Sequence, residues 1–169
     1  MEDNVLAEEK TTVISDYETE RNKPMPNRIH GKIELNLSVQ LNNNYSNQFD
    51  FAVEVTLDTS PASTPDLCIF SKKEEALDWR TVTAKESEVP LTTIEIVSPS
   101  QSMTDMAKKI MDIYFPMGVK SAWLVMPPPY KAIYVLTPDG KRKHFDEGTL
   151  TDPTTDIQIE LEKVFVGMK

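Results

Sequence analysis

The sequence has little of several features that particular classes of protein depend on. Cys68 is the single cysteine among 169 residues, so the chain has no partner for an internal disulfide. It has only two histidines, and no Cys/His pair has the spacing of a zinc site. The five glycines form neither a Gly-rich phosphate loop nor a nucleophile elbow. These absences argue against disulfide scaffolds, zinc fingers, P-loop nucleotide-binding proteins and hydrolases of the Gly-x-Ser-x-Gly type.

Long apolar runs are also missing. No run approaches the roughly 20 residues that a membrane-spanning helix needs, and the acidic start, residues 1–4, lacks the basic and apolar regions of a signal peptide. With 39% hydrophobic and 27% charged residues, the composition is that of a soluble globular protein, which we expect to be cytoplasmic. The net charge of −9 argues against nucleic-acid binding by the whole surface but leaves room for a local basic face.

The pattern of apolar residues predicts one domain over residues 17–169, preceded by an N-terminal extension over residues 1–16. We expect a helix from Asn27 to about residue 43, a helix over residues 102–117 and a short one over 161–165. Residues 71–90 read as a loop with a helical turn near 74–79. The expected strands cover residues 49–57, 67–70, 91–97, 121–126, 132–136, 143–145 and 157–159. The predicted class is therefore α/β (α+β), with a mixed sheet and helices packed on it.

Two acids stand in or beside short apolar strands. Asp66 precedes Leu67, and Glu95 lies between Ile94 and Ile96. Two carboxylates on neighbouring strands are suited to one Mg²⁺ ion, which prefers oxygen ligands. If the two carboxylates repel each other, removing either should leave the fold intact or slightly stabilised. The alternative is that both acids are solvated residues at a strand edge.

Several short motifs together carry a family resemblance. They are Pro65-Asp66-Leu67, the block Ile94-Glu95-Ile96-Val97-Ser98-Pro99-Ser100, Asp105 and Lys109, Tyr114, and the run from Gly118 to Val125, with Tyr17-Glu18 and His30 nearer the start. In these the chain resembles the Uma-type putative restriction endonucleases of the PD-(D/E)XK nuclease superfamily, over roughly residues 17–165. The resemblance implies the restriction endonuclease-like fold, a central mixed sheet flanked by helices.

The resemblance also implies a divalent metal, Mg²⁺ or alternatively Mn²⁺, between Asp66 and Glu95. In the superfamily a lysine follows the second acid by two residues, but Val97 stands there in this chain. The resemblance assigns that lysine's role to Lys109 on the next helix, with Lys108 as the alternative. Lys109 could instead pair with Asp105 one helical turn earlier.

Three further residues are candidates for the site. The resemblance makes Glu18 a candidate for a third metal ligand, with Glu20 as an alternative. The other interpretation is that Glu18 is a solvated acid in an acidic loop and binds no metal. His30 is a candidate for substrate or phosphate contact. Gln101 either binds substrate or caps the helix, although Ser102 is the more natural N-cap.

The predicted function is a metal-dependent endonuclease that hydrolyses phosphodiester bonds of nucleic acid, with DNA the expected substrate. The alternative is a non-catalytic protein that keeps the nuclease fold for binding or dimerisation. A homodimer is expected, formed through the exposed edges of the 131–145 hairpin. The basic cluster at residues 141–143 is the candidate for phosphate contact, while Trp123 and Tyr134 are predicted to be core.

Overall fold

The computed structural model of the chain describes residues 23–169. Its helical segments are α2 (Arg28–Tyr45), α3 (Met103–Lys109), the π-helical turn η1 (Ile110–Tyr114), α4 (Phe115–Met117) and α5 (Leu161–Val164). Its strands are β1 (Phe49–Val53), β2 (Leu67–Ser71), β3 (Thr92–Ile96), β4 (Ser121–Met126), β5 (Ala132–Leu136), β6 (Arg142–Phe145), β7 (Thr149–Thr151) and β8 (Gln158–Glu160). No helix within this part of the chain has the length and apolar character needed to cross a membrane.

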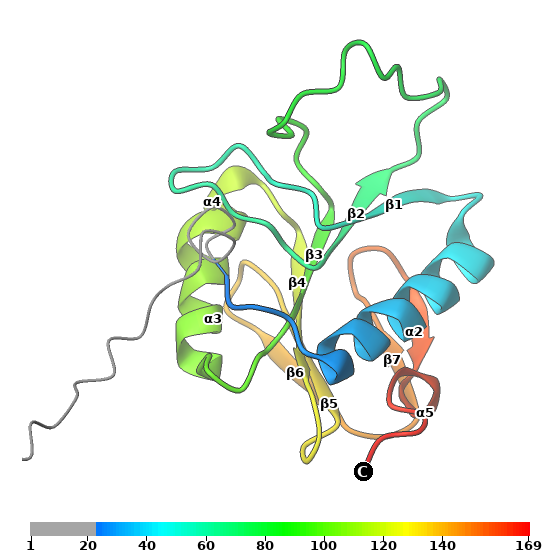
Figure 1. The fold of residues 1–169 in the computed structure, drawn as a ribbon, viewed down its shortest axis with the longest axis vertical. Coiled ribbons are helices and arrows are strands. Elements are labelled where there is room, and N and C mark those ends of the chain that lie inside the picture. The colour runs from blue at the N-terminus through cyan, green and yellow to red at the C-terminus, as the bar shows by residue number, and fades with distance from the viewer. Residues whose placement is uncertain (1–22) are drawn as a thin grey trace, which may run out of the picture.

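The first six strands form one sheet in the order β1-β2-β3-β4-β5-β6. The pair β3–β4 is parallel and the other neighbours are antiparallel, so the predicted mixed sheet is confirmed. The parallel pair requires a crossover, and α3, η1 and α4 supply it between β3 and β4. Figure 1 shows this crossover on one side of the sheet and α2 on the other.

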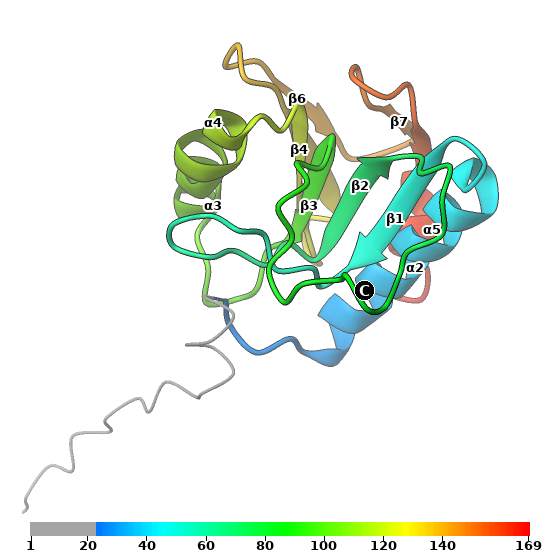
Figure 2. The same cartoon turned by 90° about the horizontal axis from the view of Figure 1, so that it is seen from above.

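Each face of the sheet packs its own apolar core, because successive strand residues point to opposite faces. On one face Ile94, Ile96 and Trp123 pack with Ile33 and further residues of α2, α5 and the β7–β8 hairpin. On the other face Cys68, Val97 and Leu124 pack with Met106, Ile110 and Tyr114 of the crossover helix. The molecule is therefore three-layered around the sheet, and Figure 2 shows the layers from above.

Helix α2 begins where the sequence predicts. Asn27 is the N-cap, and its side-chain oxygen accepts a hydrogen bond from the His30 backbone N–H at 2.9 Å. Ile33, Leu37 and Leu41 recur every four residues and are buried, but Ile29 at the same spacing is 40% exposed and lies outside the buried face. The side chain of His30 is buried in its place.

Some predicted elements differ from the structure. The strand expected over residues 49–57 ends at Val53, because Glu54 adopts a positive φ of 58° that an extended strand does not allow. Residues 74–79 form no helical turn, and β7 was not expected. Tyr134 is half-buried: it packs against the core on the α3 side and also lines a cleft, so its assignment to the core is confirmed only in part, whereas Trp123 is fully buried.

Candidate active site

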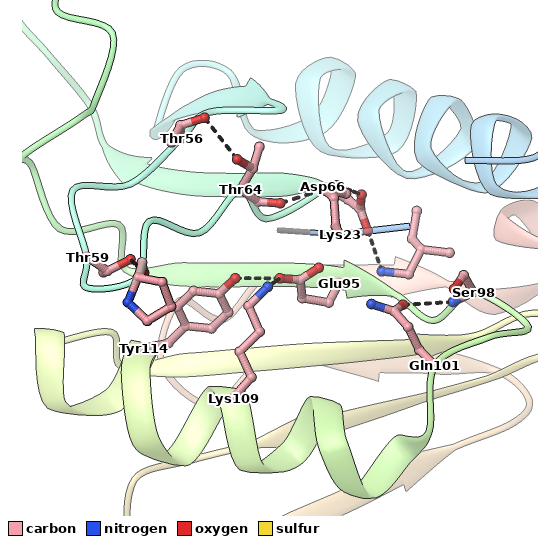
Figure 3. A network of polar contacts seen from close by, with 12 residues as sticks. Lys23, Thr56, Thr59, Thr64, Asp66, Glu95, Ser98, Gln101, Lys109 and Tyr114 are labelled. Atoms are coloured by element: carbon pink, nitrogen blue, oxygen red, sulfur yellow. Dashed lines mark hydrogen bonds and ion pairs between the residues drawn. The ribbon is translucent and has the colours of Figure 1, made fainter. Parts of the chain in front are cut away.

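Asp66 and Glu95 lie on the same face of neighbouring strands. Strands β2 and β3 are antiparallel with Leu67 opposite Ile94, and one further step of this register brings Asp66 beside Glu95. Both acids are at most 2% exposed. In Figure 3, Glu95 faces Lys109 and Tyr114 of the crossover, while Asp66, just before the neighbouring strand, lies beside Lys23. That the two carboxylates share one cation stays a prediction.

Cationic and N–H groups surround the carboxylate of Asp66. Its Oδ1 atom lies 2.5 Å from Lys23 Nζ and 3.0 Å from His30 Nε2, while its Oδ2 atom accepts the Ile96 backbone N–H at 2.6 Å. Burial by itself raises the pKa of Asp66, but the hydrogen bond from His30 and the charge and hydrogen bond of Lys23 outweigh it and lower the pKa of Asp66 below its usual range. Asp66 is therefore held as a carboxylate.

Lys23 is a member of this cluster that the sequence analysis missed. Its Nζ atom also lies 3.3 Å from Glu54 Oε2 and donates to the Thr64 carbonyl at 3.2 Å. The lysine is 43 positions from Asp66 in the chain and precedes the first described helix, so no local spacing connects the two. Only the folded chain places this ammonium between Asp66 and Glu54.

Glu95 has a different environment. Its Oε1 atom accepts hydrogen bonds from Lys109 Nζ at 3.1 Å and from the Tyr114 hydroxyl. Burial raises the pKa of Glu95, and the negative charge of Asp66 adds to this, so that the Lys109 ammonium and the Tyr114 hydroxyl only partly offset the shift. Burial beside Glu95 also raises the pKa of Tyr114, which keeps its hydroxyl protonated as a donor.

A π-helical turn brings Lys109 and Tyr114 to the same acid. In an α-helix, residues five positions apart point about 140° away from each other, since each residue turns the helix by about 100°. The wider turn η1 closes over five residues, and it begins directly after Lys109 and ends at Tyr114. The ammonium of Lys109 lies 5.4 Å from the centre of the Tyr114 ring. Both side chains therefore reach Glu95 despite their spacing.

Lys108 and Lys109 have clearly different positions. Lys108 is 74% exposed and pairs with Asp112 one turn later, whereas Lys109 is 14% exposed and pairs with Glu95 rather than Asp105. Of the two lysines weighed from the sequence, only Lys109 reaches the buried acids.

The carboxylates in this cluster suit a hard divalent cation. Glu34, Glu54 and Asp66 each offer one carboxylate oxygen, and these three oxygens lie within 4.8 Å of one another. Carboxylate oxygens are the ligands that Mg²⁺ and Mn²⁺ take. Glu34 was detectable in the sequence, because it follows His30 by four residues and so lies on the same face of α2. Glu18 and Glu20 lie outside the described residues.

His30 and Gln101 both line a cleft of about 700 Å³ beside the acids. His30 also contacts Asp66, so it belongs to the acidic cluster and to the cleft at once. The Oε1 atom of Gln101 accepts the Ser98 backbone N–H at 3.0 Å and closes the turn after β3, while Ser102 caps α3. Gln101 therefore shapes the wall of the cleft and is not the helix cap.

Comparisons with known proteins agree with this architecture. Residues 7–162 match the Uma2 family, described as "putative restriction endonuclease". A crystal structure described as a putative nuclease belonging to DUF820, from Anabaena variabilis ATCC 29413, superposes with a TM-score of 0.69 at 22% identity, over 84% of this chain and 83% of that one. No curated protein matches the chain. The fold is thus the restriction endonuclease-like fold that the sequence predicted, and the chain belongs to the Uma2 family.

Proposed function

We propose that the protein is a metal-dependent endonuclease that hydrolyses phosphodiester bonds, with DNA as substrate. One observation carries the proposal: two buried carboxylates, Asp66 and Glu95, adjoin on one sheet face with the ammonium of Lys109 against Glu95. Membership of a family described as putative restriction endonucleases supports the same reaction class.

Asp66 and Glu95 would hold Mg²⁺ or Mn²⁺, with Glu54 and Glu34 near enough to Asp66 to add an oxygen ligand. A bound divalent cation supplies Lewis-acid chemistry that polarises a phosphoryl oxygen. Glu18, the further ligand that the family resemblance implies, stays a proposal because it lies outside the described residues.

The chain's own residues would stabilise the phosphate and orient the two carboxylates. Lys109 Nζ offers N–H donors and positive charge to the phosphate as negative charge develops on it. The Tyr114 hydroxyl donates to Glu95 Oε1 and fixes the orientation of that carboxylate. His30 Nε2 does the same for Asp66. Lys109 thereby takes the place of the strand lysine that Val97 replaces.

A second candidate function is a non-catalytic protein with a nuclease fold. Lys23 favours it, because its ammonium already neutralises Asp66 at 2.5 Å and links that acid to Glu54 as a structural ion pair would. Under this reading the acids stabilise the fold and bind no cation.

Cleavage of supercoiled plasmid DNA separates the two candidates. With Mg²⁺ or Mn²⁺ the wild type should produce nicked and then linear DNA, whereas Asp66→Asn and Glu95→Gln should produce neither. Lys109→Ala should lower the rate by about 10²-fold or more, a typical loss for a stabilising donor. Lys108→Ala is the matched control and should be silent, since that side chain faces solvent. Wild-type protein that cleaves nothing with either metal would favour the non-catalytic candidate.

We also propose that the protein acts as a homodimer, since most soluble oligomers are built with twofold symmetry. The β5–β6 hairpin is the proposed contact, because β6 is an edge strand of the sheet. Light scattering at micromolar concentration tests this, and a monomeric mass would refute it.

A further inference from the structure

The cleft beside the acids has the size of a ligand site. Its volume of about 700 Å³ lies within the range of about 300–1,000 Å³ that small-molecule sites occupy. The start of α2, the turn after β3 and the hairpin between β4 and β5 form its walls. Three consecutive prolines, 127–129, restrict the backbone of that hairpin.

Aromatic rings gather along one side of the cleft. Tyr130, at the end of the hairpin, is 70% exposed. On the sheet beside it, the exposed His144 also lines the cleft, and its ring centre lies 4.7 Å from that of the half-buried Tyr134. Exposed aromatic rings are groups on which unpaired nucleobases stack, and stacking accepts any base.

The α2 end of the cleft suits a phosphate. Asn27 and His30 line the cleft at the start of this 18-residue helix, and the first turn contains no acidic residue. The positive end of the helix dipole therefore faces the cleft without a compensating carboxylate. By contrast, Asp146 lines the cleft just beyond β6 and would repel a phosphate there.

His30 connects the cleft to the acidic cluster. It is 5% exposed and contacts Asp66 through Nε2, while its Nδ1 atom is buried with no hydrogen-bond partner in the described part of the chain. A buried polar atom without a partner is costly, and a ligand group in the cleft would satisfy it after a small adjustment of the wall. A nucleic-acid strand bound at Asp66 would thus continue past His30 into the cleft.

We propose that this cleft binds an unpaired nucleotide next to the scissile phosphate, so that the substrate is a single-stranded or locally opened nucleic acid. The base stacks on Tyr130 and His144, and its phosphate lies at the start of α2. A base within a duplex is stacked on its neighbours and does not offer its faces. This inference rests on the proposed nuclease function, because it assigns the substrate class of the same site.

Binding without cleavage tests the inference. Fluorescein-labelled 12-nucleotide DNA and RNA strands of one mixed sequence, and the matching DNA duplex, would be titrated in EDTA and followed by fluorescence anisotropy. We expect at least one single strand to bind more tightly than the duplex. Whether the DNA or the RNA strand binds more tightly shows whether the site prefers deoxyribose or ribose. Tyr130→Ala should weaken that binding about fivefold or more, which corresponds to the loss of one stacked base.

Trp79→Ala is the matched control. Trp79 is 85% exposed, more than Tyr130, but it belongs to the 72–91 segment, at the opposite end of the molecule in Figure 1. Both side chains are largely in solvent, so neither substitution should unfold the protein. Equal binding of duplex and single strands, no binding of either strand, or equal effects of the two substitutions would overturn the inference. Single-strand binding by a protein that cleaves nothing would leave the cleft assignment standing and refute only the nuclease.

Discussion

At the scale of single residues, positive charge is divided unequally between the two buried acids. Asp66 contacts Lys23, His30 and a backbone N–H, whereas Glu95 contacts one ammonium and one neutral hydroxyl. The pKa of Asp66 is accordingly lowered and that of Glu95 raised. Burial is the larger cause of the raised pKa of Glu95, and repulsion by the Asp66 carboxylate adds to it.

This difference predicts opposite effects of two substitutions on the metal-free fold. Asp66→Ala leaves the buried Lys23 ammonium with less compensation and should lower the free energy of unfolding by about 3–5 kcal/mol. Glu95→Gln removes a costly buried charge and should leave that free energy unchanged or slightly raised. Urea unfolding at pH 7 in EDTA measures both. The sequence alone predicted no loss for either acid, and the contacts of Asp66 reverse that expectation for one of them.

The double variant Asp66→Ala with Lys23→Met is the control, because it removes the cation together with its partner. It should recover a large part of the lost stability, as apolar replacement of a whole buried pair often does. An Asp66→Ala variant as stable as the wild type would show that Lys23 is solvated in solution and is not held in the cluster.

At the scale of elements, the turn η1 determines which side chains reach Glu95. The apolar spacing predicted one helix over residues 102–117 and located its cap and its end correctly, at Ser102 and Gly118. It did not reveal the π-helical turn, because one extra residue in a helix changes the periodicity too little to detect over four turns. The five-residue spacing between Lys109 and Tyr114 was the only trace of it.

Deleting Met111 tests the role of this turn. Met111 is 41% exposed and lies within η1, so its removal should convert the wide turn into an α-helical one without opening the core. Lys109 and Tyr114 would then be four positions apart and still on one face. We expect a melting temperature within a few degrees of wild type, since surface changes usually cost under about 0.5 kcal/mol. Circular dichroism and the plasmid assay measure fold and activity.

Inserting an alanine after Met111 is the matched control, because it lengthens the same turn. The spacing becomes six, which an ordinary helical turn cannot place on one face, and Lys109 should turn away from Glu95. Loss of activity on insertion, with retention on deletion, is the expected contrast. If deletion abolished activity as well, the width of η1 itself would be the requirement.

For the strands too, the sequence predicted regular buried segments but not local departures from regular geometry. Apolar strands buried in the sheet, such as β4 and β5, match the sequence prediction at both ends. Where a boundary depends on one backbone conformation, as at Glu54, no side-chain pattern reveals it. The short β7 has one buried residue, Leu150, which is too little alternation to mark a strand.

At the scale of the whole molecule, the contacts that the sequence could not predict are those between distant segments. Asp66 and Glu95 could be named as candidates from the sequence because each lies in or beside a short apolar strand. Lys23 and Asp152 were not, since neither lies at a spacing that points to its partner. Asp152 is fully buried, and its Oδ2 atom accepts hydrogen bonds from Trp123 Nε1 at 2.6 Å and Ser121 Oγ at 2.8 Å. It thereby attaches the C-terminal hairpin to the central strand β4.

The last prediction concerns this attachment. Asp152→Ala leaves the buried Trp123 N–H without an acceptor, and each such loss costs about 1–3 kcal/mol, more where the lost partner is charged. We expect the free energy of unfolding to fall by about 3 kcal/mol or more, since two buried donors lose one carboxylate. Asp152→Asn keeps an acceptor oxygen and should lose less, and Glu147→Ala, an exposed change near the same hairpin, should lose nothing measurable. Urea unfolding followed by tryptophan fluorescence ranks the three variants. Equal stability of Asp152→Ala and Glu147→Ala would mean that apolar packing of Leu150 and Ile159 alone holds the hairpin to the sheet.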